Sequence, residues 1–150
     1  MSSPSEVFEC RWRPSRLLLL CYGLTQALAL LGLLWVELPP WGYGLAVALC
    51  LGHAAWVLPR HILLSSAQAF GALRHDADGW QLWSSARGWQ AIQLRPDSLA
   101  LPWVVVLRFR LANERWVRGL CIPRDALAHD IHRRLRVRLK FSRRRWAAPE

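Results

Sequence analysis

Charged side chains are almost missing from the segment that follows the N-terminus. Between Leu17 and Leu58, Glu37 is the single Asp, Glu, Lys or Arg, although the protein has 20 Lys and Arg residues and 10 Asp and Glu residues. A water-exposed helix needs a polar face, so this absence excludes an ordinary surface helix. The segment predicts membrane-spanning helices. A buried hairpin of a soluble protein is the less favoured alternative, because such helices rarely run so long without a polar face.

Catalytic signatures are absent as well. The sequence has no glycine-rich phosphate loop, no nucleophile elbow and no C-x-x-C pair. His129 and His132 lie three apart on an expected helix and are a candidate metal pair, but no third ligand has a suitable spacing. Asp76 and Asp78 flank a turn and are interpreted as turn formers. We therefore expect no enzyme, no cofactor and no metal.

The four cysteines are widely spaced, and we expect them to be free thiols. A reducing compartment and the lack of paired spacing argue against disulfides and a zinc site. They are Cys10, Cys21, Cys50 and Cys121.

Two apolar runs make up a predicted transmembrane hairpin, residues 17–59. The first, residues 17–38, would span about 33 Å as a helix at about 1.5 Å per residue, which matches a hydrocarbon core of about 30 Å. The second, residues 41–58, spans about 27 Å on the same basis. Pro39 and Pro40 cannot continue a helix without losing backbone hydrogen bonds, so the turn is expected there.

The placement of Lys and Arg predicts the orientation of this hairpin. Residues 1–16 form a basic N-terminal segment with three arginines, Arg60 follows the second run, and the turn has neither Lys nor Arg. The positive-inside rule then puts both termini in the cytoplasm. A cleaved signal peptide is not favoured, because the apolar run is too long and no small-x-small site follows it.

Small residues spaced by four predict how the two helices pack. In lipid, helices associate through close packing and polar contacts, so faces of small residues are expected to meet. These residues are Gly23 and Ala27 on the first helix and Gly44, Ala48 and Gly52 on the second.

Thr25, Gln26 and His53 are polar residues at similar depth in the two helices. A polar or ion-conducting site is one interpretation. We favour an interhelical hydrogen bond between His53 and Thr25 or Gln26, because two helices alone leave no room for a pathway unless the protein forms a homo-oligomer.

Beyond a linker at residues 60–69, residues 70–141 predict a small cytoplasmic α+β domain. Short segments with turn signals between them, such as Asp76-Ala-Asp-Gly79, are typical of an antiparallel meander of about five strands. The expected strands lie near residues 70–75, 80–84, 89–94, 103–111 and 116–122. Core packing is the expected role of their tryptophans, with an exposed subset as a partner surface. They are Trp80, Trp83, Trp89, Trp103 and Trp116.

A helix is expected after Pro123, with Asp125 as its N-cap. Leu127, Ile131, Leu135 and Leu139 form one stripe at helical spacing, which can cover the apolar face of the sheet. The alternation from Leu135 to residue 141 also fits a strand, but the stripe begins upstream of it. Residues 142–150 form a basic tail.

Basic residues dominate the end of the chain, and three partners are open. Anionic lipid headgroups are favoured first, an acidic protein second and nucleic acid least, because the domain is tethered beside a membrane. The residues are Arg133, Arg134, Arg136, Arg138, Lys140, Arg143, Arg144 and Arg145.

Four soft motifs occur in a characteristic order around the hairpin: Trp12-Arg-Pro-Ser-Arg16, Asp78-Gly-Trp80, Pro123-Arg-Asp-Ala-Leu127 and Arg133-Arg-Leu-Arg-Val137. In these motifs and this layout, the chain resembles the CptA (YgfX-like) membrane-bound toxin family of bacteria over about residues 6 to 141.

The resemblance implies a bacterial inner-membrane toxin of a type IV-like toxin–antitoxin pair. It implies inhibition of cell division and cell shape through binding of the cytoskeletal proteins FtsZ and MreB. The implied antitoxin is a small acidic protein, the succinate dehydrogenase flavinylation factor SdhE, which suits a basic partner electrostatically. Two other functions stay open: a membrane-anchored assembly factor working with SdhE, and an anchor subunit of a larger membrane complex.

Overall fold

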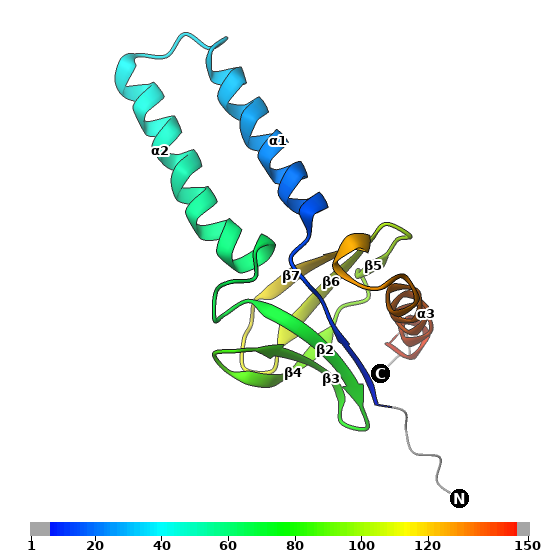
Figure 1. Cartoon of the computed structure of the whole chain (residues 1–150). Coiled ribbons are helices and arrows are strands. Elements are labelled where there is room, and N and C mark those ends of the chain that lie inside the picture. Colours follow the sequence, from blue (N-terminus) through cyan, green and yellow to red (C-terminus); the bar gives the residue numbers. More distant parts are fainter. Residues whose placement is uncertain (1–6, 147–150) are drawn as a thin grey trace, which may run out of the picture.

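Two long antiparallel helices extend from a small sheet domain in the computed structural model, which describes residues 7–146, and the side chains of residues 7–141 (Figure 1). Helix α1 comprises Arg16–Leu33 and α2 comprises Pro40–Val57, and a π-helical turn, η1, Leu58–Ile62, continues α2. No residue of α1 or α2 is buried. At about 1.5 Å per residue, the 23 residues of Pro40–Ile62 span about 35 Å and the 18 of α1 about 27 Å. Both helices are long and apolar enough to cross a membrane.

The first helix is shorter than the apolar run predicted, because it ends at Leu33 and not at residue 38. Short-range hydrogen bonds satisfy its last carbonyl groups. The Leu34 N–H donates to the Leu31 carbonyl, and the Val36 N–H donates to the Leu33 carbonyl. The Tyr43 hydroxyl then donates to the Val36 carbonyl. Apolarity alone does not distinguish a helix from a tight turn, and the residues before the two prolines are biased away from helix.

Within the described residues, the sheet has seven antiparallel strands. They are β1 Phe8–Arg11, β2 Phe70–Asp76, β3 Gly79–Ser84, β4 Gly88–Leu94, β5 Leu99–Ala100, β6 Val104–Leu111 and β7 Val117–Pro123. The five expected strands, β2, β3, β4, β6 and β7, pair in chain order. Two strands were not expected: β1, which pairs with β2, and the short β5, which pairs with β6. The N-terminal segment is therefore part of the sheet.

The Asp76 carboxylate accepts a hydrogen bond from the Asp78 N–H at 2.9 Å, and Gly79 has φ +106°. This is the turn chemistry expected between β2 and β3, since a glycine takes a positive φ without steric cost.

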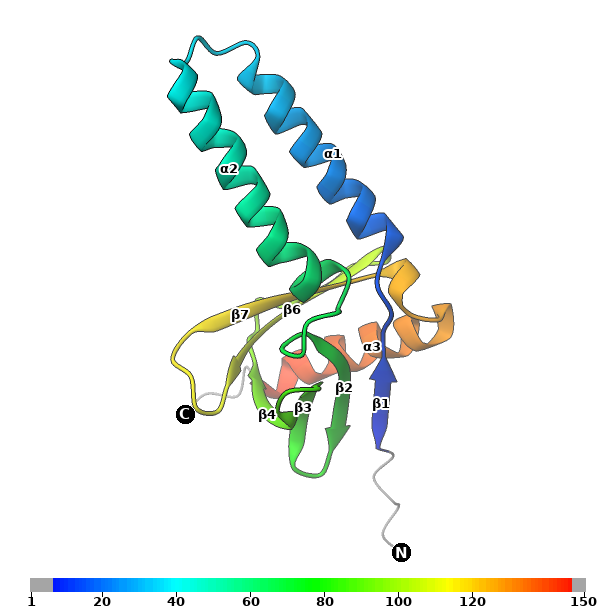
Figure 2. The same cartoon turned by 60° about the vertical axis from the view of Figure 1, so that its left-hand side comes forward.

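Helix α3, His129–Trp146, covers the concave side of the curled sheet (Figure 2). Its Leu135 and Leu139 are buried in one core cluster with Leu107 and Phe109 of β6. The stripe predicted from the sequence thus faces the sheet, and the segment from Leu135 onward is helix and not strand.

The sheet separates the hairpin from α3. Along β6, Leu107 and Phe109 point into the core that α3 covers, whereas Val106 lines a hollow with Leu18 of α1 and Val57 of α2. Because successive side chains of a strand point to opposite faces, β6 and β7 present one face to α3 and the other to the base of the hairpin. Figures 1 and 2 show the same arrangement.

Asp125 does not act as the N-cap of α3, which begins at His129. It lies in a short 3₁₀ turn, η2, Arg124–Ala126, and its carboxylate accepts hydrogen bonds from the Ser15 hydroxyl at 2.6 Å and the Leu17 N–H at 3.0 Å. The predicted cap therefore serves the start of α1 instead.

The tryptophans of the sheet divide into buried and exposed residues. Trp80 lies in the core, as does Trp12, whose indole N–H donates to the Phe70 carbonyl at 2.9 Å. Trp103 and Trp116 are 63% and 81% exposed, so the core-packing prediction was wrong for these two.

Candidate partner-binding groove

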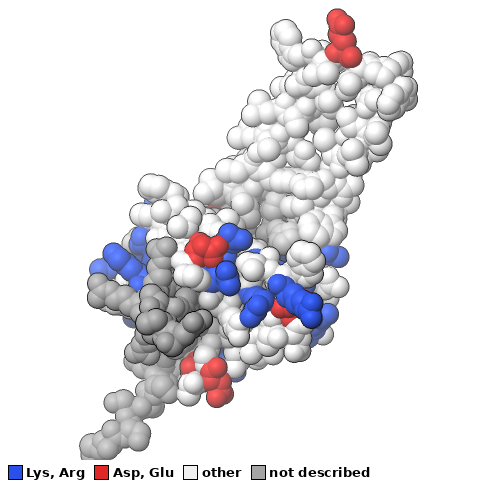
Figure 3. Space-filling model, turned by 180° about the vertical axis from the view of Figure 1, so that it is seen from behind, with Lys and Arg blue, Asp and Glu red and all other residues white. Residues whose placement is uncertain are grey.

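Basic side chains gather on the outer face of α3. Leu135 and Leu139 face the core, which leaves Arg133, Arg134 and Lys140 exposed. Figure 3 shows basic groups over the sheet domain, while the surface of the hairpin is free of them along its length. Arg143, Arg144 and Arg145 lie outside the residues whose side chains the structure describes.

A groove of about 420 Å³ runs between α3 and the segment of residues 95–102. Its lining combines four cations with short apolar and hydroxyl side chains and contains no carboxylate among the described residues. The cations are Arg95, Arg133, Arg136 and Lys140. The surface therefore favours an anionic ligand with some apolar area.

Arg136 lines this groove, but its Nε atom is buried and, within the described part of the chain, has no hydrogen-bond partner. An unpaired buried N–H costs about 1–3 kcal/mol, which is a cost to the folded domain. The contribution of Arg136 to the groove is therefore its positive charge.

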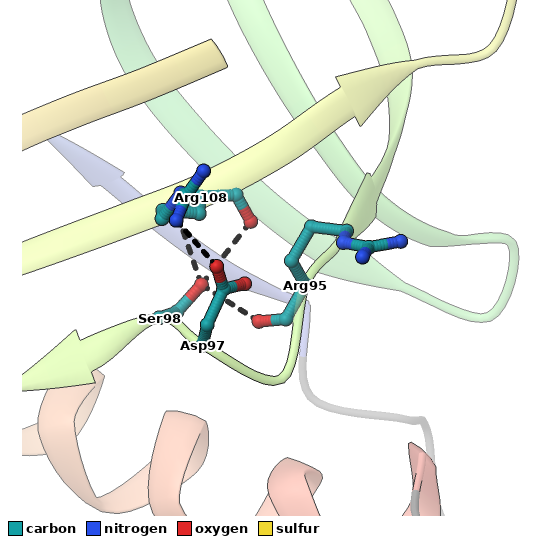
Figure 4. Close-up of polar contacts among 4 residues, drawn as sticks. All are labelled: Arg95, Asp97, Ser98 and Arg108. Carbon is teal, nitrogen blue, oxygen red and sulfur yellow. Dashed lines mark hydrogen bonds and ion pairs between the residues drawn. The ribbon is translucent and has the colours of Figure 1, made fainter. Parts of the chain in front are cut away.

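The segment that forms the other wall is held rigidly against β6 (Figure 4). The Ser98 hydroxyl accepts the Arg108 N–H at 2.9 Å and lies 2.9 Å from the Arg95 carbonyl oxygen. Asp97 pairs with the Arg108 guanidinium at 2.6 Å, while the Arg95 side chain points away from this cluster. Because Asp97 is paired with Arg108, it does not neutralise the basic residues that line the groove.

A second hollow lies on the other side of α3, beside β1. Phe8 and Val7 line it together with Arg133, Arg134 and Arg138. The Arg138 guanidinium lies 4.9 Å from the centre of the Phe8 ring, a cation–π contact. Since Arg133 lines both hollows, α3 forms a basic ridge between them.

The histidines considered as a metal pair do not converge. His132 is 2% exposed and packs in the core, whereas His129 is exposed. Burial lowers the pKa of His132, and the nearby Arg136 charge adds to this effect, so its imidazole is neutral. Among the described residues, no three His, Cys, Asp or Glu side chains lie together as a metal site would need.

A polar contact joins the two apolar helices through a residue that sequence reasoning missed. The Tyr22 hydroxyl lies 2.9 Å from Nδ1 of His53 and accepts a hydrogen bond from the Gln26 amide, also at 2.9 Å. The Gln26 amide also reaches the Cys50 carbonyl of α2 at 3.2 Å. Thr25 donates instead to Cys21 of its own helix. The sequence did contain one indication of this contact, because Tyr22 lies one helical turn before Gln26 and so shares a helix face with it.

The small residues of the hairpin do not bring the helices into close contact. A Cβ built on Gly23, Gly44 or Gly52 would meet no atom within 4 Å. Ala27 and Ala48 are exposed. These positions are open surface of the single chain.

Comparison with known proteins gave one family. A search of curated proteins and a search of solved structures each returned no match. A family model described as the membrane-bound toxin component of a toxin–antitoxin system matches residues 6–143, nearly the whole chain, which confirms the resemblance drawn from its motifs. The protein therefore belongs to the family of membrane-bound toxin components of toxin–antitoxin systems.

Proposed function

We propose that this protein is a two-pass inner-membrane toxin with both termini in the cytoplasm, and that the groove between α3 and residues 95–102 binds an acidic protein partner, its antitoxin. The observation that carries the proposal is the groove itself, with four cations and no lining carboxylate among the described residues. The toxin–antitoxin family implies that such a partner exists.

The membrane part of this proposal is supported by the helices. Both have the length and apolarity of membrane spans, and Trp35 and Trp41, 90% and 73% exposed, lie at the turn where aromatic side chains favour a membrane interface. Arg60 lies at the opposite end of the second span, where the positive-inside rule favours the cytoplasmic side.

The position of the groove favours an acidic protein over lipid headgroups. Strands β6 and β7 lie between the base of the hairpin and α3, so the outer face of α3 is turned away from the surface from which the helices extend. Screening at physiological salt leaves little attraction beyond about 8 Å. The basic residues of α3 therefore gain less from headgroups than the sequence suggested.

The acidic partner that fits the family is the flavinylation factor SdhE. In this proposal, the unbound toxin inhibits cell division and cell shape by binding FtsZ and MreB through its cytoplasmic domain, and antitoxin binding competes for the same basic groove. A groove that serves both would explain neutralisation by direct occlusion.

Charge-removing variants test this groove. Arg95→Gln/Lys140→Gln should weaken capture of SdhE by the full-length protein in native membranes and reduce growth inhibition on overexpression. Arg87→Gln/Arg110→Gln removes the same charge from exposed positions outside the groove and should leave both unchanged. Equal effects of the two pairs, or capture of neither SdhE nor a cytoskeletal protein by the unaltered chain, would contradict the proposal.

Cysteine labelling tests the orientation separately. Glu37→Cys puts a thiol at the exposed hairpin turn, and a membrane-impermeant maleimide should label it in intact spheroplasts. Asp78→Cys, at the exposed turn between β2 and β3, should be labelled only after lysis. Labelling of this position from outside would overturn the proposed topology without bearing on the groove.

A second candidate function uses the same acidic partner, because the groove would equally suit a membrane-anchored assembly factor that works with SdhE. Gene deletion separates the two. Lost flavinylation of succinate dehydrogenase supports the assembly factor, whereas altered morphology with normal flavinylation supports the toxin. An anchor subunit of a larger complex would show neither result, and it would copurify with that complex.

A further inference from the structure

Two adjoining hollows lie at the base of the hairpin, beside β6 and β7. One, the basic hollow, is lined by Trp56, Arg60 and Arg118 among others and encloses about 360 Å³. The other, the apolar hollow, encloses about 430 Å³. They share His61, Gly119 and Leu120, so they are continuous with each other.

The basic hollow can accept an anion. The Arg60 guanidinium lies 4.9 Å from the centre of the Trp56 ring, a cation–π contact that holds the positive charge beside the hollow. Arg118 reaches the same hollow from β7 and pairs with Glu114 at 2.8 Å, so it brings a partly neutralised charge. No carboxylate lines the hollow among the described residues.

The apolar hollow continues from this site along the helices. Leu18 and Tyr22 of α1, Val57 of α2 and Val106 of β6 line it. The faces of α1 and α2 beside it have no buried residue, so on the proposed membrane insertion a lipid chain enters the hollow directly from the bilayer. A water-soluble anion has no use for this apolar extension.

The depth of the two hollows matches the dimensions of a lipid. Arg60 lies near the end of a span of about 35 Å, which is the level of the headgroups when the span crosses a hydrocarbon core of about 30 Å. A phosphate at Arg60 and an acyl chain alongside Leu18 and Val57 would follow the natural orientation of a phospholipid.

We propose that these hollows form a binding site for one anionic phospholipid of the cytoplasmic leaflet, with its phosphate against Arg60 and Arg118 and one acyl chain along Leu18, Val57 and Val106. The site rests on the membrane insertion of the proposed function, but not on the partner groove. No residue of α3 lines either hollow, and the bound lipid fixes how the domain sits against the membrane.

Gly119 provides a direct test of the acyl-chain path. It lines both hollows, and a Cβ built there meets no atom within 4 Å. Gly119→Val therefore fills the shared space without a clash, and valine suits a strand position. Arg60→Gln/Arg118→Gln removes the phosphate contacts. Arg87→Gln/Arg110→Gln, at exposed positions that line neither hollow nor the partner groove, is the charge-matched control.

The experiment is lipid retention by the full-length protein, measured by native mass spectrometry after release from nanodiscs that hold equal amounts of phosphatidylglycerol and phosphatidylcholine. The unaltered chain should retain one phosphatidylglycerol. Both site variants should weaken this retention about tenfold or more, as loss of roughly two charge contacts predicts, and the control should not.

Two results would overturn the lipid site. One is equal retention of the two lipids, or equal loss in the control variant. The other is complete displacement of phosphatidylglycerol by millimolar inorganic phosphate, because that result assigns the basic hollow to free phosphate. Either result leaves capture of the acidic partner by the α3 groove unaffected, so failure of this site and failure of the proposed function are distinguishable.

Discussion

The carboxylate of Asp125 accepts a hydrogen bond from the hydroxyl of Ser15 at 2.6 Å, although 110 residues separate them in the chain. Ser15 in turn accepts the Leu18 N–H at 3.0 Å, and Asp125 takes the Leu17 N–H as well. The first turn of α1 is therefore capped jointly by its own serine and by a residue of the sheet domain. This contact fixes the base of the hairpin to the domain.

Asp125→Asn should weaken this junction, because the amide oxygen is a poorer acceptor and carries no charge at the positive end of the α1 dipole. The loss should be about 0.3–1 kcal/mol, the usual value of a charge at a helix end, because asparagine keeps an acceptor oxygen and the side chain is exposed. Thermal unfolding of the full-length protein in detergent measures it. Glu37→Gln, at the far turn of the hairpin, is the control and should leave the midpoint unchanged.

The pKa of the Asp125 carboxyl predicts that the folded protein loses stability in acid. Burial acts to raise the pKa of Asp125, but the hydrogen bonds from Ser15 and the backbone N–H groups outweigh it and hold the pKa below its ordinary value of 3.8. The ionised carboxylate therefore stabilises the folded protein above pH 3.8, and this stabilisation is lost as the pH falls through the lower pKa of the folded state. Asp125→Asn should remove this part of the pH dependence, and an unchanged acid profile would contradict the assignment.

Tyr22→Phe should loosen the hairpin, because the hydroxyl that links Gln26 to His53 is lost. Interhelical hydrogen bonds in membranes contribute about 0.6 kcal/mol on average and rarely more than about 2 kcal/mol. Steric trapping of the two helices in bicelles measures this change. Thr25→Val removes a hydroxyl that bonds only to its own helix, so a larger effect there than at Tyr22 would refute the contact.

Arg136→Met should separate stability from partner binding. The variant keeps an apolar stem but removes the buried unpaired Nε, so the free energy of unfolding should stay constant or rise by about 1 kcal/mol. Affinity for the acidic partner should fall, as measured by isothermal titration in detergent. Arg74→Met is the contrasting case. The Arg74 Nε is also buried without a hydrogen bond to any described residue, but it lies 3.1 Å from the Asp76 carboxylate, and the guanidinium donates to Gln81 at 2.6 Å and lies over Trp89, so its loss should destabilise the domain.

His132 predicts a second pH effect in a milder range. Because its pKa is lowered by burial and by Arg136, the unfolded chain binds more protons than the folded chain once the pH drops below the ordinary value of 6.5. The free energy of unfolding should therefore decrease as the pH falls below 6.5. His132→Leu should flatten the thermal midpoint between pH 5 and pH 7, whereas His129→Leu, at an exposed position, should not.

The sequence alone determined the elements whose signals are local. The two apolar runs located the helices, and glycine and aspartate clusters located the ends of the five meander strands. The turn expected at Pro39 and Pro40 lies at residues 34–39 instead, and Pro40 begins α2, where a proline loses no helical hydrogen bond. Leu135 and Leu139 were assigned to the core from helical spacing alone. These predictions succeed because periodicity and turn chemistry act between residues close in the chain.

Only the tertiary structure decided which distant residues meet. Strand β1 carries no strong local signal and forms because β2 offers a free edge, and Asp125 has the composition of a cap for its own helix but reaches α1 instead. The groove joins Arg95 to Arg136 across the sequence, and the two hollows at the hairpin join Arg60 to Arg118. Such sites depend on the curl of the sheet and on which face of each strand is turned to the hairpin. No spacing along the chain encodes these properties, because they result from the packing of all the elements together.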